Sequence, residues 1–356
     1  MTLNETIPKT HLAAVYSPDT GRTTIESVPT PQQGDLAPGQ ALVRVLFSGV
    51  CGSDINLNAA AKAANKKLVV GHEGTGLLVA LNDPLCRLAP GARVGVKYIA
   101  DTCNQCDFCL KGNDMLCPDM KAHGRHVPGT FQQYVIAYTS QLAPLPDAID
   151  LVDAAPILCG GVTVYKALRD GGVEPGDWVS IPGAGGGCGL LAIQYAKHFG
   201  LNTIAVDTGA DKEALARAQG ADKWVDFESA GGDLIKAVKA ATPDGFGPHA
   251  SIICSPSGDG YPPAFASLRP GGTAVLVGLP EGYALPVDVC LSIREKKHVK
   301  ACFVGNRQEA IDALRIAATG AVKCPVAVRP FADLQATYDE MLAGTLRGRV
   351  VIDLRA

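Results

Sequence analysis

Four cysteines with short spacing are the most specific feature of the sequence: Cys103, Cys106, Cys109 and Cys117. The pattern C-x2-C-x2-C-x7-C places four thiolates on one loop, where they can surround a tetrahedral ion with little loss of chain entropy. The spacing predicts a structural zinc site, and the Asp, Asn, Gly and Pro residues around it favour that interpretation. An iron–sulfur cluster and a chance cysteine-rich loop are the competing interpretations.

Three further potential ligands are dispersed along the chain. Cys51 lies in SGVCGSD, His72 in GHEGTG and Cys159 in APILCGG. Each has an ordinary explanation when taken alone, because a lone cysteine is more often a small core residue than a ligand. Their spacing by itself does not join them into a site.

A glycine-rich loop, GAGGGCG, runs from Gly183 to Gly189 between a strand candidate and a helix candidate. It departs from strict G-x-G-x-x-G, but its backbone amides and the following helix N-terminus suit a pyrophosphate. Asp207 follows Gly189 by 18 residues, at the end of the next strand candidate. A carboxylate there accepts the adenosine ribose hydroxyls and repels a 2′-phosphate, which favours NAD over NADP. A turn aspartate before Thr208 is the alternative.

The elements that would position these groups differ between the two halves of the chain. The first half, from about residue 12 to 158, has short alternating segments such as 41–47 and predicts an irregular β-rich domain. The second half alternates strands with helices, which predicts a doubly wound parallel sheet of the α/β class. Its strand candidates are 178–183, 203–207, 223–227, 250–254, 273–278 and 298–303, and its helix candidates are 191–199, 212–219 and 233–241. A helix over 308–319 and a last strand over 350–353 follow and are expected to return to the first domain.

Composition excludes several classes of function. The chain has 356 residues, 47% of them hydrophobic and 19% charged, which indicates two globular domains. A net charge of −3 with interspersed signs gives no basic face for nucleic acid. No apolar run approaches membrane-spanning length and the N-terminus has no targeting pattern, so we expect no membrane partner and a cytoplasmic location. Twelve cysteines in such a chain indicate metal or catalytic use instead of disulfides.

Several motifs, in order along the chain, resemble the zinc-dependent medium-chain alcohol dehydrogenases, in their short fungal and bacterial branch. They are SGVCGSD, GHEGTG, the four-cysteine loop, GTFQQY, APILCGGVTVYKAL, GAGGGCG, VLVGLP, VGNR and GRVVID. The resemblance runs from about residue 12 to 353. It implies a GroES-like catalytic domain over 1–158, to which 305–356 returns, and a Rossmann NAD-binding domain over 159–304.

The resemblance also implies roles for individual residues. Cys51, His72 and Cys159 match the ligands of a catalytic zinc with an open fourth position, so two zincs per chain are expected. Asp54 and Glu73 match carboxylates that orient the histidine and lie behind the metal. Ser53 matches the hydroxyl that takes the alcohol proton. The cofactor residues implied are Gly183, Gly185, Gly186, Gly187, Gly189, Asp207, Lys212, Val277 and Arg349, the last reaching the cofactor phosphates.

The sequence departs from the family at several positions. Gly52 replaces a basic residue that contacts pyrophosphate, and Asn56 replaces a histidine that relays protons. The stretch INLNAAAKAANKK lacks the tryptophan of ethanol-using relatives, and Tyr98 replaces a second one. We therefore expect alcohols, aldehydes or ketones bulkier than ethanol, unless a displaced residue such as Phe131 fills the space.

Two rival functions remain at this point. A zinc-free quinone or enoyl reductase has the same fold but no use for three ligands. A catalytically silent NAD-binding protein would keep only the four-cysteine zinc. The family joins subunits through the edge of the Rossmann sheet, so a homodimer or homotetramer is expected through the edge strand near residues 298–303.

Overall fold

The computed structural model describes residues 6–280, 282–346 and 348–355. The chain forms two compact units. The first comprises Met1–Cys159, Gly305–Gly320 and Pro325–Ala356, and the second Gly160–Val304 and Ala321–Cys324. Sequence analysis placed the boundaries after residues 158 and 304. The structure assigns Cys159 to the first unit and the short segment Ala321–Cys324 to the second.

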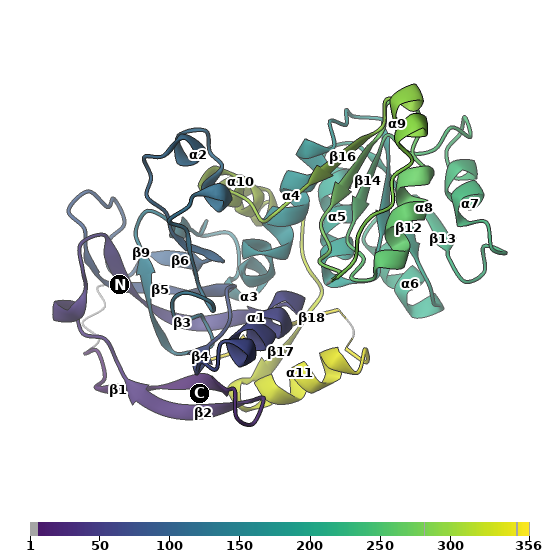
Figure 1. The fold of residues 1–356 in the computed structure, drawn as a ribbon. Coiled ribbons are helices and arrows are strands. Elements are labelled where there is room, and N and C mark those ends of the chain that lie inside the picture. Colours follow the sequence, from purple (N-terminus) through teal and green to yellow (C-terminus); the bar gives the residue numbers. More distant parts are fainter. Residues whose placement is uncertain (1–5, 281, 347, 356) are drawn as a thin grey trace. The chain divides into compact units, whose positions relative to one another are not determined.

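The first unit is built around the long strand β3 (Figure 1). One edge of β3 pairs with β5, and the other pairs with β9 in its first half and β18 in its second. The main sheet has the order β10-β6-β5-β3-β18-β17, beside the smaller sheets β2-β1-β4 and β7-β8. The strands of the whole unit are β1 (Thr10–Ser17), β2 (Arg22–Pro29), β3 (Gln40–Val50), β4 (Leu68–Val69), β5 (Gly74–Asn82), β6 (Arg93–Val96), β7 (Ile99–Asp101), β8 (Lys121–Ala122), β9 (Tyr134–Tyr138), β10 (Ala143–Pro144), β17 (Val326–Pro330) and β18 (Arg349–Asp353).

Helical segments of the first unit lie between these strands. They are η1 (Gln33–Asp35), α1 (Gly52–Ala63), α2 (Asp107–Leu110), η2 (Asp114–Leu116), α3 (Leu151–Ala154), η3 (Ala155–Leu158), α10 (Arg307–Ala318), η5 (Phe331–Asp333) and α11 (Leu334–Leu342). The expected return of the C-terminal segment takes the form of β18 paired antiparallel to β3, with Val350 opposite Val50. This pairing carries Arg349 to the end of β3, where Cys51 follows.

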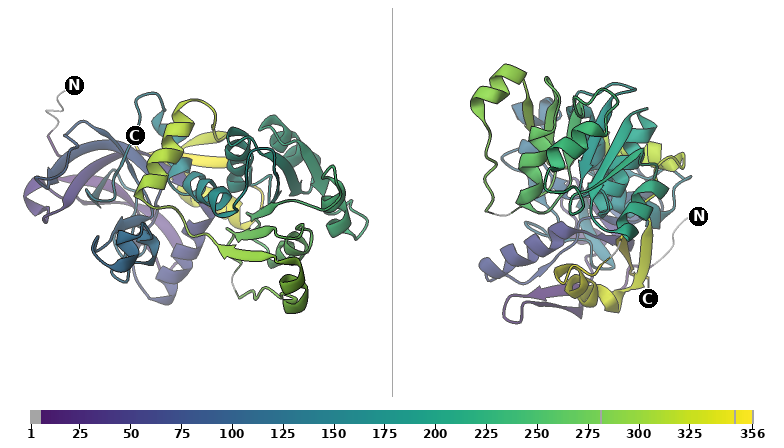
Figure 2. Two further views of the ribbon diagram at one scale, coloured as in Figure 1. Left: turned by 90° about the horizontal axis from the view of Figure 1, so that it is seen from above. Right: turned by 90° about the vertical axis from the view of Figure 1, so that its right-hand side faces the viewer.

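The second unit is a parallel sheet with the order β13-β12-β11-β14-β15-β16. Figures 1 and 2 show helices on both faces of this sheet. The predicted doubly wound sheet is therefore confirmed. Its elements are α4 (Gly160–Asp170), β11 (Trp178–Pro182), α5 (Gly187–His198), β12 (Asn202–Asp207), α6 (Ala210–Ala218), β13 (Lys223–Asp226), α7 (Leu234–Ala240), β14 (Ala250–Ile253), η4 (Gly258–Gly260), α8 (Tyr261–Ala266), β15 (Thr273–Leu276), α9 (Val289–Glu295) and β16 (His298–Ala301).

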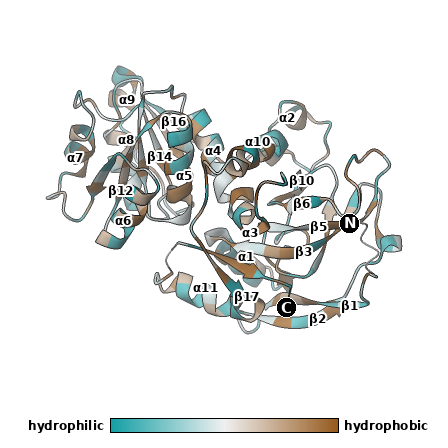
Figure 3. Cartoon of the chain, turned by 180° about the vertical axis from the view of Figure 1, so that it is seen from behind, coloured by the Kyte–Doolittle hydropathy of each residue, from teal (hydrophilic) through white to brown (hydrophobic). Residues whose placement is uncertain are grey.

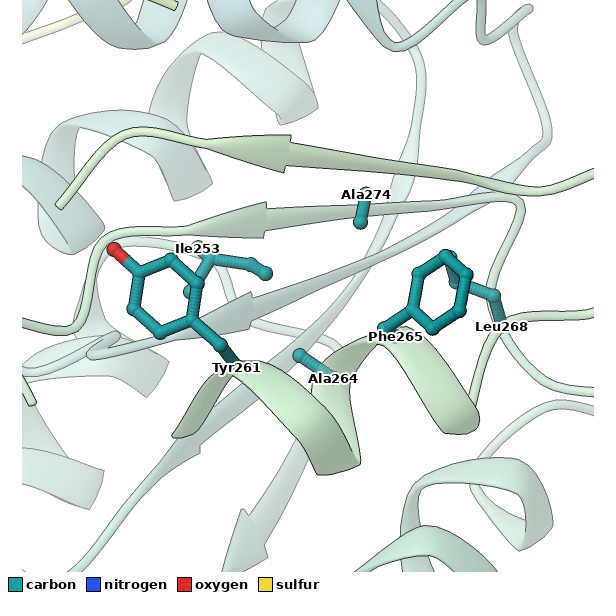
Figure 4. Packing of buried hydrophobic residues seen from close by; sticks show 6 residues of the cluster. All are labelled: Ile253, Tyr261, Ala264, Phe265, Leu268 and Ala274. Atoms are coloured by element: carbon teal, nitrogen blue, oxygen red, sulfur yellow. The ribbon is translucent and has the colours of Figure 1, made fainter. Parts of the chain in front are cut away.

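Each unit has its own hydrophobic core. In Figure 3 the inner strands β12 and β14 of the second unit's sheet carry hydrophobic residues, whereas α6 alternates between the two colours, as an amphipathic surface helix does. One core cluster of this unit packs α8 against β14 and β15 (Figure 4), through Ile253, Tyr261, Ala264, Phe265, Leu268 and Ala274. In the first unit, Phe47 of β3 packs with Ala155 and Val351, which ties the C-terminal strand to the centre of the main sheet.

Several helices lie where the sequence analysis predicted none, among them α1, α4 and α11. The alanine-rich stretch after Cys51 forms α1, because alanine has the highest helix propensity and Asp54 accepts a hydrogen bond from the Cys51 N–H at its start. Residues 334–342 form α11, which the sequence analysis did not predict.

Among the described residues no single helix could cross a membrane by length and composition, and α3–η3 with α4 reaches that length only as a bent pair.

Candidate zinc and cofactor sites

The four cysteines of the loop meet in space as predicted. Their sulfur atoms lie within 4.8 Å of one another. The Sγ–Sγ distances are 4.0 Å for Cys103–Cys109, and 3.6 Å for both Cys106–Cys109 and Cys117–Cys103. Tetrahedral zinc with bonds of about 2.3 Å needs sulfur atoms about 3.8 Å apart. The donor set and its spacing therefore fit a structural zinc ion.

Backbone amides of the loop prepare these sulfur atoms for the ion. The Cys106 N–H donates to the Cys103 sulfur at 3.3 Å, and the Cys103 N–H donates to Cys117 at 3.4 Å. Hydrogen bonds from the Gln105 and Cys106 amides lower the pKa of Cys103 to about 7, whereas desolvation raises the pKa of Cys109 to about 12. A bound cation supplies the charge that keeps such a thiol ionised.

The start of α10 holds this loop in place. The Arg307 Nε lies 3.1 Å from the buried carboxylate of Asp114, and a second guanidinium nitrogen donates to Asn104 at 3.0 Å. The Asn306 amide donates to the Gly112 carbonyl at 2.9 Å. The VGNR motif thus anchors the loop, a role that spacing alone did not indicate.

The dispersed residues form a second, fully buried cluster in the first unit. Ligand atoms of Cys51, His72, Glu73 and Cys159 lie within 4.8 Å of one another, and the Cys51 and Cys159 sulfurs are 3.9 Å apart. Cys51 follows β3, His72 and Glu73 lie between β4 and β5, and Cys159 follows η3. Two thiolates and an imidazole at this spacing fit zinc, and three ligands leave a coordination position open.

Asp54 orients the imidazole of His72. The His72 Nδ1 lies 3.0 Å from an oxygen of Asp54, which is completely buried and accepts the Cys51 N–H with its other oxygen at 2.9 Å. Pairing at Nδ1 leaves Nε2 free for a metal ion. Burial lowers the pKa of His72, but the charges and hydrogen bonds of Asp54 and Cys51 together outweigh burial, so the pKa lies well above the usual value. A hydrogen bond with Cys159 holds the pKa of Cys51 well below that of a free thiol.

Glu73 lies beside the ligands and forms an ion pair with Arg349. Both side chains are buried, and burial raises the pKa of Glu73 to about 8 despite the arginine. A side chain at Gly49 would overlap the Glu73 carboxylate, so glycine is required at this point of β3. The contact between Arg349 and cofactor phosphates stays a prediction.

The remaining residues predicted near this cluster lie on α1, between β6 and β7, and between β8 and β9. Ser53 and Asn56 are half-buried in the first turns of α1, and Gly52 is exposed, with open space where a side chain would be. The Tyr98 ring packs edge-on against His72, with 5.5 Å between ring centroids. Phe131 is fully buried against Tyr338 of α11, where it belongs to the core.

Two buried polar side chains of the first unit were missed by sequence analysis. The Tyr338 hydroxyl has no hydrogen-bond partner among the described residues; burial raises its pKa, and the charges of Asp54 and Cys51 add to this shift. The Lys97 amine donates to Gln141 at 2.5 Å, and desolvation lowers its pKa to about 7. Neither residue belongs to a recognisable motif.

In the second unit, the glycine loop has the close packing of a dinucleotide site. Gly183, at the end of β11, has φ +82°, and a side chain on Gly189 would overlap its carbonyl oxygen. A Cβ at Gly185 would lie 2.6 Å from the Lys212 side chain. Gly186 is the N-cap of α5, and Gly187 begins the helix. These glycines place the backbone N–H groups of the loop and the N-terminus of α5 at the point where a pyrophosphate would bind. The loop therefore fits NAD.

Asp207 ends β12 beside this loop. Its carboxylate accepts the Gly185 N–H at 3.0 Å and lies 2.7 Å from the Lys212 ammonium group. Val277 follows β15, and its N–H donates to the Ile253 carbonyl at 3.1 Å. The predicted cofactor residues of this unit therefore gather at the carboxyl ends of its strands, where open α/β sheets bind ligands.

A β-rich unit with two thiolate clusters and a doubly wound unit with a glycine loop together define a zinc- and nicotinamide-dependent dehydrogenase. Comparison with known proteins agrees. Residues 37–147 match the alcohol dehydrogenase GroES-like domain, and residues 187–319 match the zinc-binding dehydrogenase domain.

Whole-chain relatives extend this agreement. Alcohol dehydrogenase 1 of Neurospora crassa is 39% identical over 349 residues, 98% of each chain. An alcohol dehydrogenase of Schizosaccharomyces pombe is 38% identical over 353 residues, 98% of this chain and 99% of that protein. The crystal structure of an NAD-dependent alcohol dehydrogenase matches with a TM-score of 0.84 at 25% identity, over 96% of this chain and 99% of the other. The chain belongs to the zinc-dependent medium-chain alcohol dehydrogenase family, and the predicted fold, enzyme class, zinc and NAD are confirmed.

Proposed function

We propose that this enzyme transfers hydride between NAD(H) and alcohols, aldehydes or ketones that are bulkier than ethanol, with Cys51, His72 and Cys159 as the ligands of the catalytic zinc. The observation that carries the proposal is the meeting of these three residues in one buried cluster, although Cys51 and Cys159 are 108 positions apart in the sequence. A zinc-free reductase has no use for such a cluster, and neither does a silent NAD-binding protein.

The residues around the cluster have distinct tasks in this proposal. Zinc bound there would supply a Lewis acid that lowers the pKa of an alcohol hydroxyl. Asp54 fixes the His72 ring at Nδ1 and leaves Nε2 available to the metal. The Ser53 hydroxyl takes up the alcohol proton, because a hydroxyl can accept one proton while donating another. Asn56 cannot carry that proton onward as a histidine would, so the proton leaves through water or another group.

Substrate size follows from the side chains near the cluster. Indole rings would bury roughly 200 Å² each and leave room for short alcohols only. The chain has Tyr98 beside His72, and half-buried asparagines on α1, at Asn56 and Asn58. Phe131 packs into the core and does not compensate for the missing rings. A short alcohol would make few contacts and lose the positioning on which fast hydride transfer depends.

Steady-state kinetics with a series of alcohols tests this proposal. We expect kcat/KM with NAD to rise from ethanol to hexanol and benzyl alcohol. The variant Tyr98→Trp should shift the preference back toward ethanol, and the conservative Tyr98→Phe should not. A clear optimum at ethanol in the unmodified enzyme would contradict the size preference while leaving the metal assignment intact.

A homodimer or homotetramer is proposed for the assembly. The edge strand β16 has all four residues exposed, and Val299 within it is apolar and 42% exposed. Exposed strand edges of this kind pair readily with another chain. Light scattering during gel filtration should give two or four times 36.9 kDa. Elution as a monomer would contradict this assembly.

A cytoplasmic location is also proposed. All twelve cysteines are free of disulfides, as is usual where thiols are kept reduced. Cell fractionation with antibody detection tests this location, and recovery of the protein outside the cytosolic fraction would contradict it.

A further inference from the structure

The ion pair between Asp207 and Lys212 raises a question about cofactor choice. The ammonium group lies 2.7 Å from the carboxylate, so its positive charge offsets part of the negative charge that a group bound beside the pair would meet. Asp207 can still accept ribose hydroxyls, but its repulsion of a 2′-phosphate is reduced by the lysine. Another feature of the site must add to the discrimination between NAD and NADP.

A second carboxylate stands next to Asp207. Asp226 ends β13, and the parallel register pairs the Cα atoms of Asp207 and Asp226. Its oxygens accept hydrogen bonds from the Thr208 hydroxyl at 3.0 Å and the Gly209 N–H at 3.3 Å. The turn that follows Asp207, where a 2′-phosphate would lie, is therefore tied directly to Asp226.

Asp226 carries a negative charge that hydrogen bonds stabilise but no ion pair among the described residues neutralises. Its remaining hydrogen bonds come from the backbone N–H groups of Glu228 at 2.9 Å and Ser229 at 3.1 Å. No lysine or arginine forms an ion pair with it within the described part of the chain. The Ser229 and Gly209 amides keep its pKa below the usual value, so it is ionised at neutral pH. Gly209 has open space where a Cβ would be, so crowding there does not exclude a phosphate.

We propose that Asp226 is a specificity-determining residue of the cofactor site, which disfavours NADP by placing an unpaired carboxylate at the Thr208–Gly209 turn. The proposal rests on binding of NAD at the glycine loop and concerns only the choice between the two cofactors. In this proposal Asp207 binds the ribose hydroxyls, and Lys212 offsets the negative charge of Asp207. Asp226 then repels the 2′-phosphate of NADP. The single charge of Asp226 would face a 2′-phosphate of charge about −2 across roughly 7 Å of water-like medium. The resulting repulsion weakens the binding of NADP about tenfold.

Fluorescence titration of the dialysed enzyme with NADH and NADPH, without substrate, tests the proposal. We expect Asp226→Asn to lower the NADPH dissociation constant about tenfold at low salt, with less than a twofold change for NADH. Glu228→Gln is the matched control, because it removes the same charge from an exposed side chain two residues away, and it should change neither constant by more than twofold. Thr208→Val loosens the turn without changing charge, so it should affect both cofactors alike.

Salt dependence separates repulsion from a structural effect. The NADPH-to-NADH ratio of dissociation constants in the unmodified enzyme should fall as salt rises to about 1 M, where the screening length is about 3 Å. This measurement also tests the proposal should Asp226→Asn fold poorly. Equal changes for both cofactors in Asp226→Asn, or a salt-independent ratio, would overturn the proposal. Tighter binding of NADPH than NADH by the unmodified enzyme would instead contradict the assignment of NAD itself.

Discussion

Replacing Asp54 with asparagine tests how the protein orients its zinc-binding histidine. The substitution keeps the side-chain shape but removes the charge that faces the His72 Nδ1 at 3.0 Å. Both residues are at most 1% exposed, so water cannot replace the lost partner. Loss of such an indirect contact typically costs 10- to 100-fold in metal affinity, which is about 1.4–2.7 kcal/mol.

Competition between the enzyme and a chromogenic zinc chelator measures this effect. We expect Asp54→Asn to release one zinc per chain at 10- to 100-fold lower chelator concentration, while the four-cysteine zinc is retained. The matched control is Asp19→Asn, the same change at an exposed turn position, which should release both ions as the unmodified enzyme does. Unchanged release of both ions from Asp54→Asn would refute the claim that Asp54 supports the metal through His72.

Three further predictions concern the cofactor, a buried amine and the proton path. Asp207→Ala removes the ribose acceptor and leaves Lys212 unpaired, so the NAD-over-NADP ratio of kcat/KM should narrow by about tenfold or more; an unchanged ratio would refute this. The folded-state pKa of Lys97 is about 7, below its unfolded value, so the unfolded chain binds more protons between pH 7 and 10 and stability should rise with pH in that window. Denaturant titrations should show a gain of about 2 kcal/mol from pH 7 to 9 that Lys97→Met abolishes, and an identical pH slope in the variant would contradict this. Asn56→His should speed alcohol oxidation near neutral pH if proton release from Ser53 limits the rate, and an unchanged pH profile would exclude that explanation.

How far the sequence could predict each site depends on how local the site is. The four-cysteine loop spans 15 residues from Cys103 to Cys117, so short-range spacing was enough to predict its ligand cluster. Cys51, His72 and Cys159 are brought together only by the pairing of distant strands, which no local pattern reports. For these ligands the resemblance to a family was necessary, and the structure supplied the geometry.

The fold shows the same contrast. The alternation of apolar runs with helices indicated every strand of the parallel sheet. The signal is clearest for the inner strands such as β14, because a buried parallel strand is continuously hydrophobic. The helix α1 was not predicted because its apolar residues give no clear amphipathic pattern: only Asp54, Leu57 and Ala61 are buried, and the helix rests on the propensity of its alanines. Lys97 and Tyr338 were missed because a buried polar residue is recognised by its surroundings, which depend on the tertiary fold.

Zinc content per chain, measured together with turnover in two cysteine variants, tests the central claim most directly. Cys159→Ala should contain one zinc instead of two, lose turnover and keep its melting temperature within a few degrees, because the four-cysteine site is intact. Cys106→Ala should also lose one zinc, but with a clear fall in melting temperature. Two zincs and normal turnover in Cys159→Ala would contradict the assignment of Cys51, His72 and Cys159 as the catalytic zinc ligands.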